Sequence, residues 1–323
     1  MQNSENSLKP LLRTTDLTKQ FKNSDGSTIT ACDHVSIDVM PGKTLGIVGE
    51  SGCGKTTLMK MLVGLLTPDS GSIDFDGTDL LAVKGEQARQ MRRDIQLIFQ
   101  DPGTAFNPRM KIAEIICGPL LNFDLITRKE MAETAAKYLD MVELPREFAG
   151  RYPHELSGGQ RQRIGLARAL TLHPKLIICD EVTSALDVSV QKSMIALLKK
   201  FQREDNIAYI FICHDLALVE QVADDIEVMY KGAIVETMVS ENIREKSEHP
   251  YTRVLIDSVF EPGMRRSGPV RTGAGEETDK ISDPRGCSFY DRCPEALPVC
   301  GEEKPHLQPV SEHHQLACRL GSK

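Results

Sequence analysis

The sequence has no tryptophan, only 5% aromatic residues and no excess of positive charge. Its 39 Lys and Arg residues are outnumbered by 46 Asp and Glu residues, which gives a formal net charge of −7. Because a protein that coats nucleic acid needs clustered Lys and Arg residues to contact phosphates, this balance argues against a nucleic-acid partner. Glycine and proline, with 24 and 17 residues, stand near their average frequencies, so the chain of 323 residues is not of low complexity.

Long hydrophobic runs are missing as well. No apolar run approaches the roughly 18 residues that a membrane-spanning helix requires. Residues 1–7 contain neither an apolar stretch nor a basic region, so we expect no secretory signal and a cytosolic chain. Five cysteines lie scattered in apolar or glycine-rich stretches, where a free cysteine behaves as a small hydrophobic residue: Cys32, Cys53, Cys117, Cys179 and Cys213.

Apolar runs that predict strands alternate with segments of helical periodicity. The strands are expected at residues 10–21, 44–49, 95–99, 176–179 and 209–213, and the helices at 56–66, 131–139 and 159–172. Continuous β-prone runs are typical of strands that helices cover on both faces. The alternation therefore predicts an α/β fold with a helical insertion, at about residues 105–170.

The last fifth of the chain has a different composition. Residues 261–286 contain almost no large apolar residue before Ile281 and read as a linker. We therefore expect a main domain at residues 1–260 and, after the linker, a small Cys-rich extension at residues 287–323.

A glycine-rich motif lies between the strand expected at residues 44–49 and the helix expected after it. Residues 49–56 fit the pattern Gly-x-x-x-x-Gly-Lys-Thr, and this strand–helix context argues against a chance glycine-rich turn. Glycines let backbone N–H groups surround phosphate oxygens, while the positive end of the helix points at them. In such a loop Lys55 reaches the β and γ phosphates and the Thr56 hydroxyl ligates Mg²⁺. The predicted nucleotide contacts are Gly49, Ser51, Gly52, Cys53, Gly54, Lys55, Thr56 and Thr57.

Two acidic residues follow the strand expected at residues 176–179. In a P-loop protein a carboxylate at the end of such a strand lies beside Mg²⁺, which is the role predicted for Asp180. The next residue, Glu181, can hold the attacking water and accept its proton. Apolar runs that end in acids are common, so the weight of this prediction comes from the P-loop in the same chain.

Residues 156–160, Leu-Ser-Gly-Gly-Gln, resemble the signature sequence of ATP-binding cassette (ABC) ATPases. In that family the signature of one subunit closes over the ATP of the other, with oriented N–H groups and a helix dipole directed at the γ-phosphate. By itself the pentapeptide is also compatible with a simple helix cap. The resemblance implies nucleotide contacts from Ser157, Gly158, Gly159 and Gln160.

Further positions resemble the other ABC elements in the expected order. Gln100 resembles the Q-loop glutamine, which contacts Mg²⁺ and couples to the transport partner, and residues 184–187 resemble the D-loop of the dimer interface. His214 resembles the switch histidine that contacts the γ-phosphate, and Phe21 takes the place of the aromatic residue that stacks on adenine. The resemblance implies that residues 9–260 form the P-loop NTPase core of an ABC ATPase that binds ATP and Mg²⁺.

The sequence departs from the family pattern at one position, because Val182 stands where a proline is usual. That proline shapes a turn and takes no part in the chemistry, so we expect activity to survive.

Several stretches resemble, within this family, the ATPase subunits of oligopeptide and dipeptide permeases. They are residues 46–55, 106–110, 152–155, 185–191 and 249–252, and residues 107–110 favour the second of the two paralogous ATPases. The resemblance implies a peripheral subunit on the cytoplasmic face of the inner membrane, whose ATP hydrolysis powers import. Its implied partners are a second, paralogous ATPase in a heterodimer, two transmembrane permease subunits and an external substrate-binding protein.

Other readings of the function stay open. Di- and oligopeptides are the expected cargo, but relatives in this subgroup also import nickel, glutathione, opines or sugars. A soluble ABC ATPase that acts on ribosomes or DNA is disfavoured by the single P-loop and the lack of a heptad block. An exporter is disfavoured by residues 249–252 and by the Cys-rich extension.

The four remaining cysteines lie in the Cys-rich extension, at Cys287, Cys293, Cys300 and Cys318. In a cytosolic chain they suggest a metal site more than disulfides, yet the spacing lacks the close C-x2-C pairs usual for structural zinc. Residues 286–294 resemble the extension of peptide-permease ATPases, in some of which a 4Fe-4S cluster on four cysteines is implied. Unoccupied thiols, zinc or a disulfide are the alternatives. We expect three histidines nearby to be solvated and not ligands: His306, His313 and His314.

Overall fold

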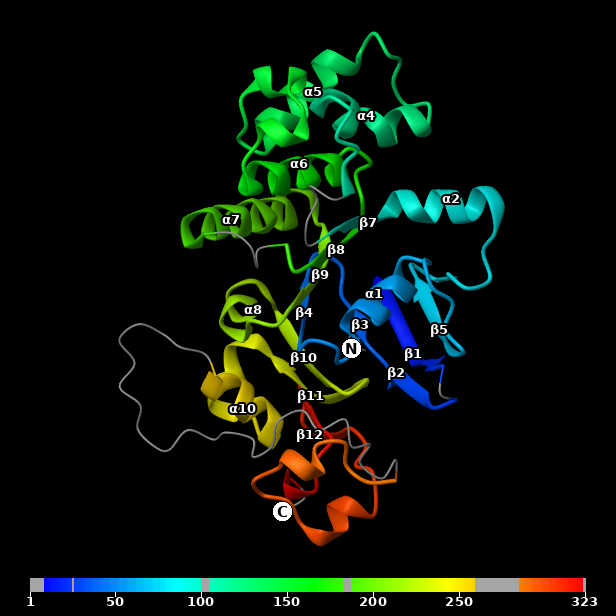
Figure 1. The fold of residues 1–323 in the computed structure, drawn as a ribbon, viewed down its shortest axis with the longest axis vertical. Coiled ribbons are helices and arrows are strands. Elements are labelled where there is room, and N and C mark those ends of the chain that lie inside the picture. Colours follow the sequence, from blue (N-terminus) through cyan, green and yellow to red (C-terminus); the bar gives the residue numbers. More distant parts are fainter. Residues whose placement is uncertain (1–8, 25, 100–104, 183–186, 259–284, 322–323) are drawn as a thin grey trace, which may run out of the picture. The chain divides into compact units, whose positions relative to one another are not determined.

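Figure 1 shows the computed structural model of the chain, which describes residues 9–24, 26–99, 105–182, 187–258 and 285–321. These residues fold as two compact units. The first contains residues 9–12, Val39–Lys43 and Asp74–Phe211; the second contains Arg13–Asp38, Thr44–Ile73 and residues 212–321. The Cys-rich extension therefore belongs to the same compact unit as the glycine-rich loop. Within the described residues, no helix has both the length and the apolar character to cross a membrane.

The second unit is built around β4 (Thr44–Val48), whose five residues are all buried. It pairs in parallel with β10 (Asp225–Tyr230), which continues into the antiparallel strand β11 (Ala233–Val239). Lys231 and Gly232 form the two-residue turn, both with positive φ (41° and 87°), which matches the twist of a tight hairpin.

The Cys-rich extension completes this sheet. Its strand β13 (His314–Leu316) pairs antiparallel with β11, and β12 (Gln308–Ser311) pairs with β13, so the order in this unit is β12-β13-β11-β10-β4 (Figure 1). The other elements of the second unit are β1 (Leu12–Lys22), β2 (Thr28–Val35), β3 (Asp38–Val39), α1 (Lys55–Leu62), β5 (Ser70–Phe75), α8 (Leu216–Val222), α9 (Ile243–Lys246) and α10 (Pro250–Ser258), with short 3-10 turns at Ser240–Asn242, Tyr290–Arg292, Pro298–Gly301 and Arg319–Gly321.

The first unit contains a parallel sheet and a group of helices. The strands run in the order β9-β8-β7, where β7 is Ile95–Ile98, β8 is Leu176–Asp180 and β9 is Ala208–Cys213. The first four residues of β8 and all of β9 are buried, as expected for strands covered on both faces. The remaining elements are β6 (Thr78–Asp79), α2 (Gly85–Asp94), α4 (Ile112–Asn122), α5 (Met131–Met141), α6 (Gly158–Leu170) and α7 (Val188–Asp205), with 3-10 turns at Arg146–Gly150 and Pro153–Glu155.

Helices α4, α5 and α6 pack on one another and form the predicted helical insertion (Figure 1). Their buried side chains include Ile116 of α4, Leu139 of α5 and Leu166 of α6, all without exposed surface. The spacing of these apolar residues is what predicted helices at 131–139 and 159–172, and both helices are confirmed within two residues at each end.

The expected strands are all confirmed, and one expected helix needs correction. The helix expected at 56–66 ends at Leu62, because Gly64 (φ 70°) takes the chain into a turn. Strands β10 and β11 were missed, as were the two strands of the Cys-rich extension. The linker predicted at 261–286 lies almost wholly outside the described residues.

Candidate functional site

The glycine-rich loop runs from the end of β4 to the first turn of α1 and needs glycine at two places. A Cβ at Gly49 would lie 2.2 Å from the carbonyl oxygen of Met229, and one at Gly54 would lie 2.1 Å from that of Ala31. Gly54 also has φ 114°, a conformation that side chains of L-residues rarely adopt. The loop is therefore shaped by close packing against β2 and β10 within the second unit.

Lys55 is folded back onto this loop and is only 6% exposed. Its Nζ donates to the carbonyl oxygens of Gly49 at 2.6 Å and Glu50 at 2.8 Å, and lies 3.5 Å from Cys53 Sγ. Burial raises the pKa of the Cys53 thiol, and the Lys55 ammonium opposes that rise. The ammonium is thus held among backbone carbonyls, ready to exchange these partners for anionic oxygens.

The remaining loop residues present groups to solvent at the start of α1. Ser51, Gly52 and Thr56 are exposed, and Thr57 is half-buried. The N-cap residue of this eight-residue helix is Gly54, which has no side chain to accept from the first backbone N–H groups. This arrangement suits a phosphate group.

Asp180 and Glu181 follow the buried part of β8 in the first unit. Asp180 is half-buried, and Glu181 has φ 46°, in the left-handed region. A residue held in this region marks an abrupt change of chain direction at the strand end. Val182, which replaces the usual proline, is fully buried and fills a core position.

The signature residues form the N-terminus of α6. Ser157 Oγ accepts from the Gln160 N–H at 3.3 Å, and Gln160 Oε1 accepts from the Ser157 N–H at 2.9 Å, which makes a capping box. Gly159 has no room for a side chain, because a Cβ there would lie 2.4 Å from Val190 of α7. Ser157 and Gly158 are nevertheless exposed. The helix cap is therefore real, and the same groups are accessible to a ligand.

The other predicted residues lie at strand ends or outside the described residues. His214 follows β9 and is exposed, and Phe21, near the end of β1, is 41% exposed. Asp187 caps α7 by accepting from the N–H groups of Ser189 and Val190. Gln100 and residues 184–186 lie outside the described residues.

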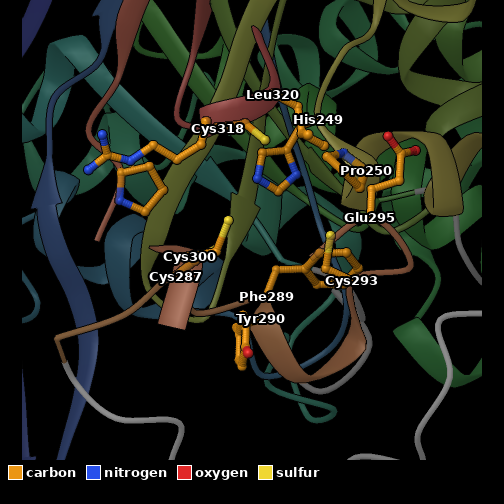
Figure 2. A pocket seen from close by; sticks show the side chains of 12 residues that line it. His249, Pro250, Cys287, Phe289, Tyr290, Cys293, Glu295, Cys300, Cys318 and Leu320 are labelled. Carbon is orange, nitrogen blue, oxygen red and sulfur yellow. The ribbon is translucent and has the colours of Figure 1, made fainter. Parts of the chain in front are cut away.

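The four cysteines of the Cys-rich extension line one small cavity, of about 20 Å³ (Figure 2). His249 lines it too, and Figure 2 shows its imidazole among the cysteines. All nine cysteines of the chain are free thiols. Burial raises the pKa of Cys293 to about 11, and burial lowers the pKa of His249 to about 4, so both groups are neutral near pH 7.

A four-thiol donor set fits an iron–sulfur cluster chemically, but its present arrangement is not that of a formed site. Within the described part of the chain, no group of three or more His, Cys, Asp or Glu side chains has the geometry to hold a metal ion. A cavity of about 20 Å³ has room for water.

The prediction for His314 was wrong, whereas His306 and His313 are exposed as expected. His314 is only 7% exposed, and its Nε2 lies 2.9 Å from Glu236 Oε1. Glu236 of β11 is fully buried and also accepts from the backbone N–H groups of Glu248 and His249. The pairing of β13 with β11 brings the two side chains together, which the sequence pattern could not indicate.

Sequence reasoning also missed a contact between the glycine-rich loop and the Cys-rich extension. Arg292 donates from its two terminal nitrogens to the Glu50 carboxylate, at 2.7 and 2.8 Å. The Glu50 N–H donates to the Tyr251 hydroxyl at 2.8 Å. Arg292 and Tyr251 lie within two of the stretches that resemble permease ATPases, but nothing in those stretches indicated Glu50 as their partner.

Two family models match the chain. One, described as "ABC transporter", matches residues 32–184, and the other, described as "Oligopeptide/dipeptide transporter, C-terminal region", matches residues 235–300. Among curated proteins, the chain is 42% identical to the oligopeptide transport ATP-binding protein OppF of Escherichia coli over 96% of both chains. It is 44% identical to the oligopeptide transport ATP-binding protein AppF of Bacillus subtilis, over 91% of this chain and 90% of that protein.

Solved structures give the same fold. The dimeric bacterial ABC transporter cassette MJ0796 aligns with a TM-score of 0.65 and 28% identity, over 71% of this chain and 98% of that one. CbiO1 from Clostridium perfringens, part of the transporter complex CbiONQ, aligns with a TM-score of 0.64 and 26% identity, over 74% of this chain and 92% of that one. The chain has the α/β fold of an ABC ATPase, belongs to the ABC transporter ATP-binding proteins of the oligopeptide/dipeptide family, and is the ATPase of an ABC importer.

Proposed function

We propose that this ATPase binds ATP and Mg²⁺ at its glycine-rich loop, hydrolyses ATP together with a second subunit, and thereby powers the import of di- or oligopeptides. The observation that carries the peptide assignment is the match of residues 235–300 to the oligopeptide/dipeptide transporter model, because it lies outside the ATPase elements common to ABC proteins. Relatives named for oligopeptide transport cover almost the whole chain, which supports the same assignment.

Lys55 is proposed to bind the β and γ phosphates. Its Nζ already faces the inside of the loop, where it exchanges two carbonyl partners for phosphate oxygens when nucleotide enters. The backbone N–H groups of the residues Gly52 to Thr57 add donors at a helix N-terminus. Phe21 is proposed to stack on adenine, since its ring is exposed near the end of β1.

The reaction is proposed to need five further side chains. When bound, Mg²⁺ neutralises charge on the phosphates, with Thr56, Asp180 and Gln100 as the proposed ligands and contacts. Glu181 orients the attacking water and accepts its proton, and His214 holds the γ-phosphate.

The second half-site of the chain is proposed to be the signature at α6. Ser157 and the N–H groups of Gly158, Gly159 and Gln160 would bind the γ-phosphate held by the partner ATPase, because they present donors at an exposed helix N-terminus. Residues 184–187 are proposed to lie at the same dimer interface.

The complete importer is proposed to contain a paralogous second ATPase, two permease subunits and an external binding protein, with this chain peripheral on the cytoplasmic side. The helical insertion, residues 105–170, and Gln100 would transmit ATP-driven closure to the permease subunits. The proposed domain limits are 1–260 for the ATPase, 261–286 for the linker and 287–323 for the Cys-rich extension. Nickel, glutathione, opines and sugars are the alternative cargoes.

We also propose that the extension can bind a 4Fe-4S cluster through Cys287, Cys293, Cys300 and Cys318. The support is that the four thiols line one cavity and that none is in a disulfide. Such a cluster, when bound, would supply a cross-link between the segments that carry its ligands. Iron and acid-labile sulfide assays on anaerobically purified protein test this, and the absence of both would refute it.

Uptake by a strain that lacks this chain tests the peptide assignment. We expect uptake of a labelled tripeptide to fall to background and to return with the wild-type chain but not with Glu181→Gln. Normal peptide uptake in the deletion strain, together with loss of nickel, glutathione, opine or sugar uptake, would refute the peptide assignment and leave the ATPase chemistry standing.

A further inference from the structure

Glu50, the second residue of the glycine-rich loop, is held at three of its groups. Its backbone N–H donates to the Tyr251 hydroxyl at 2.8 Å, and its carbonyl oxygen accepts from Lys55 Nζ at 2.8 Å. Both oxygens of its carboxylate accept from Arg292, at 2.7 and 2.8 Å. The residue that positions the Lys55 ammonium is therefore itself positioned by Tyr251 of α10 and by Arg292 of the Cys-rich extension.

The environment of Arg292 fixes the direction of its guanidinium. Its central carbon lies 5.8 Å from the ring centroid of Tyr230 and 5.7 Å from that of Phe289, and the side chain is 18% exposed. The rings of Tyr230, Tyr251 and Phe289 pack together, with centroids 4.5 to 5.4 Å apart. A two-pronged, charge-assisted contact within such a cluster has one preferred geometry.

Arg292 also adjoins the cysteine cavity. It ends the turn Tyr290–Arg292, and the flanking residues Phe289, Tyr290 and Cys293 line that cavity (Figure 2). The turn is fixed by backbone bonds, since the Arg292 N–H donates to the Phe289 carbonyl and the Cys293 N–H to that of Tyr290. Arg292 is therefore the side chain by which the extension reaches the loop.

We infer that Arg292 is a positioning residue for nucleotide binding, which neutralises and orients Glu50 and so ties the Cys-rich extension to the phosphate-binding loop. The inference rests on the proposed role of that loop. ATP carries several negative charges, and an unpaired carboxylate within the loop repels them. Arg292 neutralises the charge of that carboxylate and keeps the Glu50 carbonyl where it can hold and release Lys55.

The test is the dissociation constant for ATP of the purified full-length chain, measured by titration calorimetry. We expect Arg292→Ala to weaken ATP binding about tenfold, because a partly buried carboxylate loses its neutralising partner. The ATP affinity of Arg292→Lys should lie between those of wild type and Arg292→Ala, since an ammonium supplies charge but not the two-pronged contact. The loss of ATP affinity in Arg292→Ala should shrink to about threefold or less at 1 M salt, because the Debye length is then about 3 Å and the repulsion is screened.

A second substitution separates charge from structural support. The double variant Glu50→Gln/Arg292→Ala should bind ATP within about twofold of Glu50→Gln alone, because no unpaired charge is left in the loop. Lys304→Ala is the matched control, because it removes another ion pair between the extension and the ATPase core, with Asp33, which lies outside the loop. We expect it to leave the ATP dissociation constant unchanged within about twofold.

Each outcome discriminates between the loop assignment and this inference. Unchanged affinity in Arg292→Ala, with binding abolished in Lys55→Ala, refutes the inference and leaves the loop assignment intact. Equal losses of ATP affinity in Arg292→Ala and Lys304→Ala also refute the inference, as does a failure of Glu50→Gln to restore the affinity of Arg292→Ala. Either result indicates that the docked extension supports the structure in general and not through the charge of Glu50. Normal ATP binding in Lys55→Ala refutes the loop assignment and the inference with it.

Discussion

Replacement of Gly54 by alanine tests whether the shape of the glycine-rich loop is set by packing. Gly54 precedes α1 and has φ 114° and ψ −7°. An alanine Cβ there would lie 2.1 Å from the Ala31 carbonyl oxygen and 2.7 Å from Met229 Cε. The methionine can move, but the backbone oxygen of β2 cannot give way without disturbing the strand, so the loop itself has to shift.

The size of the effect follows from two contributions. Placing an L-residue at a positive φ destabilises the fold by about 1–2 kcal/mol, and a backbone clash of this kind adds about 1–3 kcal/mol. The two contributions together amount to about 2–5 kcal/mol, and we expect Gly54→Ala to lower the free energy of unfolding by about 3–4 kcal/mol, the middle of that range. Gly64 offers a matched control, because its φ is 70° and nothing lies within 4 Å of an added Cβ. There we expect a loss of about 1 kcal/mol, from backbone strain alone.

Urea unfolding followed by circular dichroism measures the stability of both variants, and ATP titration measures binding. Gly54→Ala should lose ATP binding because the displaced loop no longer aligns its N–H groups, whereas Gly64→Ala should bind ATP normally. Equal losses of stability in the two variants, or normal ATP binding by Gly54→Ala, would refute the argument that contact with Ala31 shapes the loop.

Three further predictions concern single side chains. Glu181→Gln should bind ATP with unchanged affinity but lower the turnover of its site by about 10²–10⁴-fold, since the amide cannot accept the proton of water. Full hydrolysis by this variant in a complex whose other site is inactivated would refute that role. Ser157→Asp keeps a good helix cap but places a negative charge opposite the γ-phosphate, so its stability should match wild type while the ATPase activity of the assembled pair falls. Ser157→Ala should instead lose about 1 kcal/mol of stability, because the cap is removed. Equal ATPase activity in wild type and Ser157→Asp would exclude a phosphate contact. Burial raises the pKa of Glu227 well above its ordinary value of about 4.5, so between the two pKa values the folded chain holds a proton that the unfolded chain has lost. Glu227→Gln should therefore become more stabilising as the pH rises above about 4.5, by up to about 1.4 kcal/mol per pH unit until the folded-state pKa is reached. A pH-independent difference in urea unfolding would contradict this.

The sequence predicts this fold well wherever local pattern and local chemistry coincide. The loop at residues 49–56 could be recognised because its glycines, its lysine and its strand–helix context all lie within a short stretch. The buried runs that became β8 and β9 are continuous and β-prone, so their assignment needed no knowledge of distant residues. Helix α6 combines a capping box with apolar periodicity, and both are visible in the sequence.

The missed features depend on residues far apart in the chain. Arg292 and Glu50 are separated by 242 positions, and their pairing appears only once the Cys-rich extension docks on the second unit. The burial of His314 likewise follows from the pairing of β13 with β11. The hairpin of β10 and β11 did carry a local signal, the two-residue turn Lys231-Gly232 between apolar runs, and could have been found. The roles of Gln100 and residues 184–186 stay predictions, because these residues lie outside the described part of the chain.

Affinity capture of the chain from solubilised native membranes, followed by mass spectrometry, tests the central claim most directly. We expect recovery of two permease subunits and a second ATPase of the same family, in amounts comparable to this chain, with an external binding protein present when the membranes retain it. Recovery of the chain only as a homodimer without membrane subunits, or with ribosomes, would contradict the assignment to a heteromeric importer.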